Sequence, residues 1–201
     1  MRGALLLLGL LLSACPVPTL PGDQPMGLYS LSATFTDRDE SCILPELQPP
    51  NDGGTFDFGF DATLTRDSSS TQAWMTLAGY SREGTFDGQY FTTVHDAPRV
   101  FSACSLCETR VTESITFSMF SRSQGDAVGG QCPDDALDGG TPLPNPDAGV
   151  TGPRQTTQGF DAVRLCGRLT TVLTSIGLDG GACKPECSGC ALRYQLRGDR
   201  R

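Results

Sequence analysis

The sequence has few of the residues on which most catalytic and metal sites depend. It contains one histidine, His95, in 201 residues, which excludes every site that needs two or more imidazole groups. It also lacks the motifs G-x-S-x-G, H-E-x-x-H and G-x-G-x-x-G and the phosphate-binding loop. These absences argue against the common hydrolases, zinc enzymes and nucleotide-binding enzymes. We therefore expect a non-enzymatic protein without a cofactor or a metal.

Positive charge and long apolar runs are also scarce. Lysine and arginine total 15 against 23 aspartates and glutamates, and the net charge of −8 argues against a nucleic-acid partner. The longest apolar run, Ala4–Leu12, is shorter than the ~20 residues that a membrane-spanning helix needs. Because Arg2 precedes this run, it is typical of the core of a secretory signal peptide.

The apolar run ends in Leu12-Ser13-Ala14-Cys15, which resembles the lipobox of bacterial lipoproteins. The excess of arginine over lysine and the Asp-Gly-Gly and Pro loops at 138–149 are similar to those of small envelope lipoproteins of unknown function from myxobacterial-type genomes. The resemblance implies that the signal peptide, residues 1–14, is removed and that Cys15 carries palmitate or a similar acyl chain, so that the lipid bilayer is a partner. Pro16 stands where many inner-membrane lipoproteins have Asp, which favours the outer membrane. The alternative is a secreted protein in which Cys15 is structural.

Eight cysteines follow Cys15, and an even number in an exported protein predicts four disulfides. The sequence leaves their pairing open, because eight cysteines allow about 105 connectivities. The candidates are Cys42, Cys104, Cys107, Cys132, Cys166, Cys183, Cys187 and Cys190.

Two cysteine clusters allow other interpretations. The pair Cys104-x-x-Cys107 and the group around Cys187 together imitate a zinc ribbon, but a zinc site needs reduced thiolates, which suit the cytosol. A thioredoxin-like role needs the C-x-x-C at a helix N-terminus, and no βαβ pattern surrounds it. We therefore expect structural disulfides, and the enzymatic alternative is a hydrolase or oxidoreductase that uses Cys104, Cys107 or His95.

After the signal peptide, residues 1–14, the composition divides the chain into three parts. Residues 15–27 contain four prolines and predict an extended tether. Residues 28–197 form a single β-domain, in which the Gly-, Pro- and Asp-rich stretch 125–153 is a mobile loop, and residues 198–201 form a tail. The loop contains Asp134, Asp135 and Asp138, but their spacing does not match a calcium loop.

Alternation of apolar and polar residues with a period of two predicts strands along the β-domain. We expect Gln72–Tyr80 to form one strand and Asp87-Gly88 to form a two-residue hairpin turn. The β-branched residues at 170–174 favour a strand over a helix. About eight strands without intervening helices predict an all-β fold, either an antiparallel up-and-down barrel or a sandwich. The alternating runs are 29–35, 56–64, 111–119, 163–173 and 192–196, of which 56–64 is the clearest.

Glu113 is the most informative polar residue, because it shares a strand face with apolar residues. A carboxylate that faces inward among apolar groups must be paired or have a raised pKa, and the alternative is that Glu113 lies at the rim in water. This leaves a second hypothesis, a calycin-like carrier of a small apolar ligand, beside the structural or interaction role with an unknown envelope protein. In the carrier, a cavity would be lined by Glu113, Trp74, Tyr80, Tyr90 and Phe117.

Overall fold

The computed structural model describes residues 19–40, 42, 56–99, 101, 104, 106–127, 132, 161–179, 181–187 and 189–201. The predicted signal peptide, Cys15 and nearly all of the 125–153 stretch, including its aspartates at 134, 135 and 138, lie outside the described residues.

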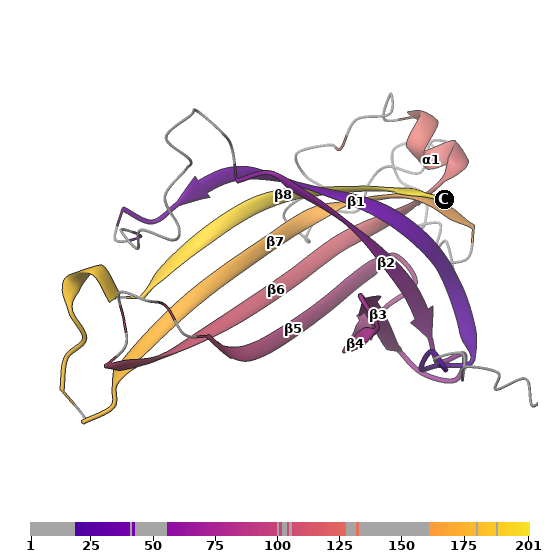
Figure 1. Cartoon of the computed structure of the whole chain (residues 1–201). Coiled ribbons are helices and arrows are strands. Elements are labelled where there is room, and N and C mark those ends of the chain that lie inside the picture. Colours follow the sequence, from indigo (N-terminus) through magenta and orange to yellow (C-terminus); the bar gives the residue numbers. More distant parts are fainter. Residues whose placement is uncertain are drawn as a thin grey trace, which may run out of the picture.

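Eight antiparallel strands form one closed barrel in which each strand pairs with its neighbours in the sequence (Figure 1). The barrel closes because β1 pairs with β8 as well as with β2. This confirms the all-β prediction and decides between its two forms in favour of the up-and-down barrel. The strands are β1 (Gln24–Arg38), β2 (Phe58–Arg66), β3 (Gln72–Leu77), β4 (Tyr80–Phe86), β5 (Tyr90–Arg99), β6 (Cys107–Ser121), β7 (Ala162–Gly177) and β8 (Cys190–Arg200).

Alternation along the strands separates an apolar interior from a polar outer wall. Inside, the rings of Phe91 and Phe117 stack with centroids 4.9 Å apart, and Leu64, Met75 and Ile115 are fully buried. Outside, residues such as Ser32, Thr34, Arg193, Gln195 and Arg197 face away from the core. Burial of the inner face supplies the main stabilisation, because apolar area removed from water contributes about 25 cal/mol per Å².

Gly167 lies where β7 passes close to the backbone of β6. A Cβ atom at this position would lie 2.5 Å from the Cβ of Phe117 and closer still to the carbonyl oxygen of Thr116. The register pairs Gly167 with Phe117 on one side and with Leu196 on the other. The large Phe117 ring is therefore accommodated in the barrel because its neighbour has no side chain.

The strand Gln72–Tyr80 predicted from the sequence is wrong, because the chain turns at Ala78-Gly79. Both turn residues have positive φ, 47° for Ala78 and 86° for Gly79, and Leu77 pairs with Tyr80 across the turn. Two-residue hairpins take this conformation because it matches the right-handed twist of the strands. The usual Asn-Gly or Asp-Gly signal is absent here, so the residues between 72 and 86 form two strands instead of one.

The hairpin at Asp87-Gly88 is confirmed, but its turn is longer than predicted. Three residues, 87–89, separate β4 from β5. The carboxylate of Asp87 accepts hydrogen bonds from the backbone N–H groups of Gln89 at 3.0 Å and Tyr90 at 2.7 Å. In this turn the N–H of Tyr90 therefore donates to the Asp87 side chain, whereas in a two-residue turn the acceptor would be a backbone carbonyl oxygen.

The barrel extends beyond both predicted limits of the domain. Strand β1 begins at Gln24, inside the predicted tether, and β8 continues to Arg200, inside the predicted tail. Tyr29 pairs with Arg200 and Leu31 with Gly198, so these terminal residues complete the closure of the barrel. The helix α1 (Arg122–Ala127) takes the first residues of the predicted loop.

All eight predicted cysteines form disulfides, which confirms the predicted number of bonds. The pairs are Cys42–Cys190, Cys104–Cys187, Cys107–Cys183 and Cys132–Cys166. The first three join the end of the barrel opposite Gln24, where β6 and β8 begin and β7 ends. We call this region the disulfide end, and the end that contains Gln24 the tether end.

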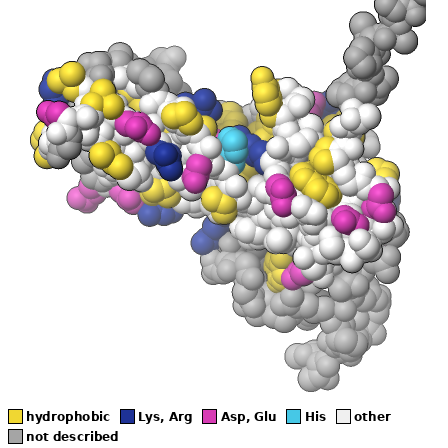
Figure 2. All heavy atoms as spheres, turned by 90° about the horizontal axis from the view of Figure 1, so that it is seen from below, with side chains coloured by type: hydrophobic (Ala, Val, Ile, Leu, Met, Phe, Trp, Pro, Cys, Tyr) yellow, Lys and Arg dark blue, Asp and Glu magenta, His cyan; other side chains and the backbone are white. Residues whose placement is uncertain are grey.

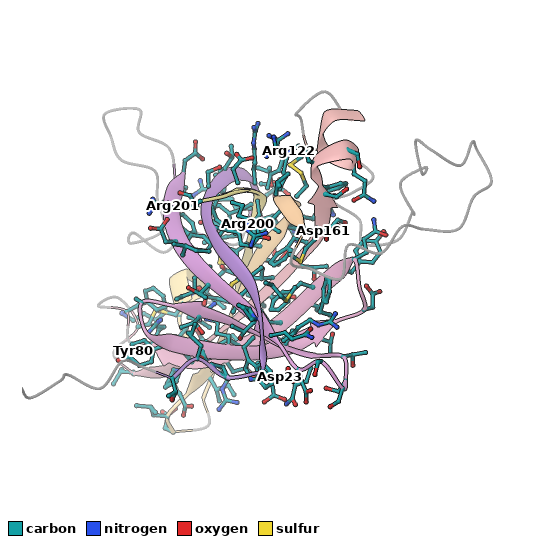
Figure 3. All side chains as sticks on the ribbon, turned by 90° about the vertical axis from the view of Figure 1, so that its right-hand side faces the viewer. Asp23, Tyr80, Arg122, Asp161, Arg200 and Arg201 are labelled. Carbon is teal, nitrogen blue, oxygen red and sulfur yellow. A yellow bond between two sulfur atoms is a disulfide. The ribbon has the colours of Figure 1, made fainter. Side chains whose placement is uncertain are left out.

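Tyr29 and Arg200 link β1 and β8 to the first residue of β7 at the tether end. The hydroxyl of Tyr29 donates to the carbonyl oxygen of Ala162 at 2.9 Å, and the guanidinium of Arg200 donates to the same oxygen at 3.4 Å. Figure 3 views this end of the barrel and labels Arg200 and Asp161 near its centre. Burial raises the pKa of Asp161 above its usual value, although the Arg200 charge opposes this shift.

Candidate binding site on the inner wall of the barrel

Three polar side chains, Arg82, His95 and Glu113, lie on consecutive strands of the inner wall. The guanidinium Nη2 of Arg82 lies 2.6 Å from the carboxylate Oε2 of Glu113, and their side chains are 19% and 26% exposed. His95, coloured cyan in Figure 2, pairs directly with Glu113 across β5 and β6 and is half-buried. The structure therefore pairs the inward carboxylate of Glu113 with a cation.

The register explains why these three residues share the inner face. Met75 pairs with Arg82 and is fully buried, and Thr93, two residues before His95, is also buried. Because side chains alternate along a strand, Arg82 and His95 point to the same side as these core residues. Strands β4 and β5 pair at only three positions, from Gly84 to Phe86, so the ladder between them ends before it reaches Arg82. The polar group thus lies where the wall is least complete.

Arg82 is the residue of this group that the sequence did not indicate. Its position on the inner wall depends on the turn at Ala78-Gly79, which shifts the alternation between β3 and β4. Because the sequence predicted one strand over 72–80, it gave no indication that Arg82 faces the interior and pairs with Glu113. Arg82 could have been predicted if residues 72–77 and 80–86 had been recognised as two strands on either side of Gly79.

Aromatic side chains gather on another part of the wall, formed by β1, β2 and β8 and separated from the Arg82–Glu113 pair by β3 and β7. Phe35 contacts Phe56 and Tyr194 edge to face, with centroids 5.4 and 5.7 Å apart. Phe58 contacts Tyr194 at 5.4 Å and Phe60 at 5.8 Å. Burial, and to a smaller extent the charge of Asp57, raises the pKa of Tyr194 above its usual value. Such a group offers apolar contact area together with one hydroxyl.

The five ligand-binding residues proposed from the sequence do not come together. Glu113 and Phe117 face the interior. Trp74 and Tyr90 occupy the outward positions of β3 and β5, beside the buried residues Met75 and Phe91. Tyr80 lies at the β3–β4 turn and is 80% exposed, so it cannot line an enclosed cavity.

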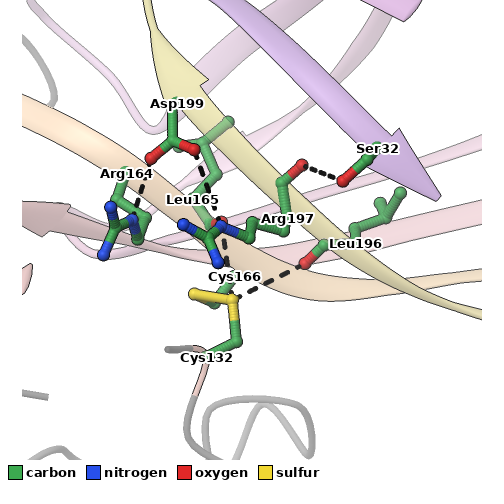
Figure 4. The surroundings of a disulfide bond; sticks show 8 residues. All are labelled: Ser32, Cys132, Arg164, Leu165, Cys166, Leu196, Arg197 and Asp199. Atoms are coloured by element: carbon green, nitrogen blue, oxygen red, sulfur yellow. Dashed lines mark hydrogen bonds and ion pairs between the residues drawn. A yellow bond between two sulfur atoms is a disulfide. The ribbon is translucent and has the colours of Figure 1, made fainter. Parts of the chain in front are cut away.

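Two pockets formed by described residues lie on the outer wall. Their volumes are about 320 and 290 Å³, and they share Gln195 on β8. Cys132 lines one of them, held there by its bond to Cys166 (Figure 4). In the same view, Asp199 lies between Arg164 at 2.9 Å and Arg197 at 3.5 Å, so one carboxylate is shared by two arginines.

A third pocket, of about 130 Å³, lies at the disulfide end and is lined by four cysteines. Among the residues that the structure describes, no three side chains of histidine, cysteine, aspartate or glutamate are placed to hold a metal ion. The described part of the chain also has no helix of the length and apolar character required to cross a membrane.

No family model, no curated protein and no solved structure gives a significant match to this chain. The assignment of the candidate site therefore depends on the geometry of the barrel itself.

Proposed function

We propose that the protein is an envelope lipoprotein, anchored through acylated Cys15, whose barrel has a non-enzymatic structural or interaction role. One observation carries this proposal. The four disulfides use eight of the nine cysteines, and Cys15 is the one that remains. Cys15 is the cysteine of the predicted lipobox and is available for acylation, and the disulfides suit the oxidising compartment outside the cytoplasm. The polar outer wall suits a domain that its anchor holds in water.

The attachment of the N-terminal segment sets the distance between the barrel and the lipid. The backbone N–H of Asp23 donates to the carbonyl oxygen of Arg66 at 3.1 Å, and the carboxylate of Asp23 accepts from the N–H of Ser68 at 2.7 Å. Seven residues separate Cys15 from Asp23, and they span at most about 28 Å. With Cys15 in the bilayer, the tether end faces the membrane and the disulfide end faces away from it.

Metabolic labelling with radioactive palmitate tests the anchor. We expect the wild-type protein to incorporate label and to remain with the membrane fraction, and the Cys15→Ser variant to lose both properties while keeping its four disulfides. A serine variant that is still labelled, or a wild-type protein that is not labelled, would contradict the proposal.

A second candidate function is the transport of a small, largely apolar ligand. It is favoured by the Arg82–Glu113 pair and by the aromatic group around Tyr194, because ligand sites are mainly apolar with a few well-placed polar groups. Native mass spectrometry and displacement of a fluorescent apolar dye distinguish the two functions. If the protein is a carrier, it retains a ligand in native mass spectrometry, and Arg82→Ala weakens the binding of that ligand. A purely structural barrel binds neither ligand nor dye.

A further inference from the structure

Two disulfides meet in the pocket at the disulfide end, and they differ in their access to solvent. Cys107–Cys183 is half-buried, whereas Cys104 and Cys187 are 3% and 1% exposed. All four residues line the same pocket of about 130 Å³. An outer disulfide thus lies beside an inner one, and a thiol from solvent reaches the outer one first.

The sequence spacing allows these four cysteines to pair in a second way. Cys104 and Cys107 form a C-x-x-C, and Cys183 and Cys187 are four residues apart, in a turn that closes when the N–H of Cys187 donates to the carbonyl oxygen of Lys184 at 2.8 Å. Each cysteine is therefore bonded to a cysteine of the other segment and has a second cysteine three or four residues away in its own segment.

We propose that Cys107–Cys183 is a thiol–disulfide exchange site that reacts with cysteine-containing polypeptides, and that Cys104–Cys187 is its internal resolving partner. In the first step, the peptide thiolate attacks Sγ of Cys183. The bond between Cys107 and Cys183 breaks, a mixed disulfide forms between the peptide and Cys183, and the electron pair leaves on Cys107 as a thiolate.

In the second step, the Cys107 thiolate attacks Sγ of Cys104, which forms Cys104–Cys107 and releases Cys187 as a thiolate. In the third step, the Cys187 thiolate attacks Cys183 in the mixed disulfide, which forms Cys183–Cys187 and returns the peptide thiolate. The number of disulfides is unchanged, so the sequence requires no oxidant or reductant besides the peptide thiol. Lys184 lines the same pocket, where a cation stabilises a departing thiolate.

Apolar side chains beside the pocket indicate the kind of peptide that this site binds. Leu106, Ile176 and Leu178 are 74%, 66% and 69% exposed. Leu178 lies next to Leu106, because its N–H donates to the carbonyl oxygen of Leu106 at 3.1 Å, and Ile176 precedes Leu178 by two residues at the end of β7. An exposed apolar surface next to an accessible disulfide favours cysteines flanked by apolar residues, as in incompletely folded chains.

The first test maps the order in which the disulfides of the intact protein react. The oxidised protein is mixed with glutathione, quenched with acid, alkylated with N-ethylmaleimide and analysed by peptide mass spectrometry. We expect glutathione on Cys183 or Cys107 at least about tenfold faster than on Cys42 or Cys190, which are 2% and 4% exposed, because buried disulfides exchange more slowly. Equal rates at all four bonds, or earlier reaction at another bond, would overturn the proposal.

The second test examines the resolving step. At later times we expect peptides linked through Cys104–Cys107 and Cys183–Cys187, and we expect the mixed disulfide to disappear. In a variant with Cys104→Ser and Cys187→Ser, the mixed disulfide should instead accumulate. If wild-type protein accumulates the mixed disulfide without forming Cys104–Cys107, the internal relay is wrong, and this result does not depend on whether the variant folds.

The third test examines peptide selection. A cysteine peptide flanked by leucines should react several-fold faster than glutathione, and Leu106→Ser or Leu178→Ser should remove this advantage without changing the glutathione rate. Val94→Ser is the matched control, because Val94 is also an exposed apolar residue but lies on β5. An advantage that survives in both leucine variants would overturn the assigned peptide class.

Discussion

Tyr29 shows how one buried side chain makes the stability of the barrel depend on pH. It is fully buried, and its hydroxyl donates to the carbonyl oxygens of Ala162 at 2.9 Å and Met26 at 3.3 Å. Burial raises the pKa of Tyr29 to about 12 from an ordinary value of 10.0, although the nearby Arg200 charge lowers it in part. The folded protein therefore holds the phenol proton more tightly than the unfolded chain does.

This difference predicts a loss of stability at alkaline pH. The contribution of neutral Tyr29 is fully present below about pH 10 and is lost as the pH rises through about 12, because the unfolded state ionises first. Between about pH 9 and 11 we expect the free energy of unfolding, measured with urea, to fall by about 1.3 kcal/mol from this residue. Tyr29→Phe should be less stable at neutral pH but should lack this part of the slope. Parallel pH curves for the two proteins would contradict the assignment.

The turn between β3 and β4 is the element that decides where Arg82 points. Ala78 occupies the left-handed region with φ of 47°, a conformation that asparagine tolerates better than alanine. Because Leu77 pairs with Tyr80, a register change at this turn would move Arg82 to the outer wall and leave Glu113 without its partner. The geometry of the candidate site therefore depends on two turn residues that do not contact it.

A substitution at this turn tests its conformation. Ala78→Asn should raise the free energy of unfolding by roughly 0.5–1 kcal/mol, because Asn-Gly suits a two-residue hairpin. Gly79→Ala should lower it, and since a Cβ atom there meets no atom within 4 Å, the loss would come from the backbone alone. Urea denaturation measures both. Destabilisation by Ala78→Asn would show that the turn differs from the one described.

Closure of the barrel is a property of the whole molecule, and it makes the C-terminal residues structural. Gly198 and Arg200 on β8 pair with Leu31 and Tyr29 on β1, and Gly198 also pairs with β7. Removal of these residues exposes the edges of both neighbouring strands. It also removes Arg200 from the tether end, where it donates to the carbonyl oxygen of Ala162.

Truncation after Arg197 should therefore lower the midpoint of thermal unfolding by several degrees, measured by circular dichroism with the disulfides intact. The control is Arg201→Ala, which removes only a partly exposed ion pair with Asp61, at 2.8 Å. Such pairs contribute at most about 1 kcal/mol, so the control should unfold close to the wild-type temperature. A truncated protein as stable as the control would mean that residues 198–200 do not close the barrel.

Much of the fold follows from patterns that are local in the sequence. The alternation at 29–35 and 111–119 predicts strands because side chains alternate across a sheet, and the even number of cysteines predicts four disulfides. The same alternation places Glu113 on the apolar face, which is where the structure has it. These predictions need no knowledge of which strand lies next to which.

The remaining features depend on contacts between residues that are far apart in the chain. The partner of Glu113, the pairing of the cysteines and the choice of a barrel over a sandwich all require the register of several strands at once. Gln24 and Arg200 lie in stretches whose composition suggests a tether and a tail, yet both are in strands because pairing across the barrel outweighs local preference. Local sequence determines which segments form strands, whereas closure of the sheet decides which side chains meet.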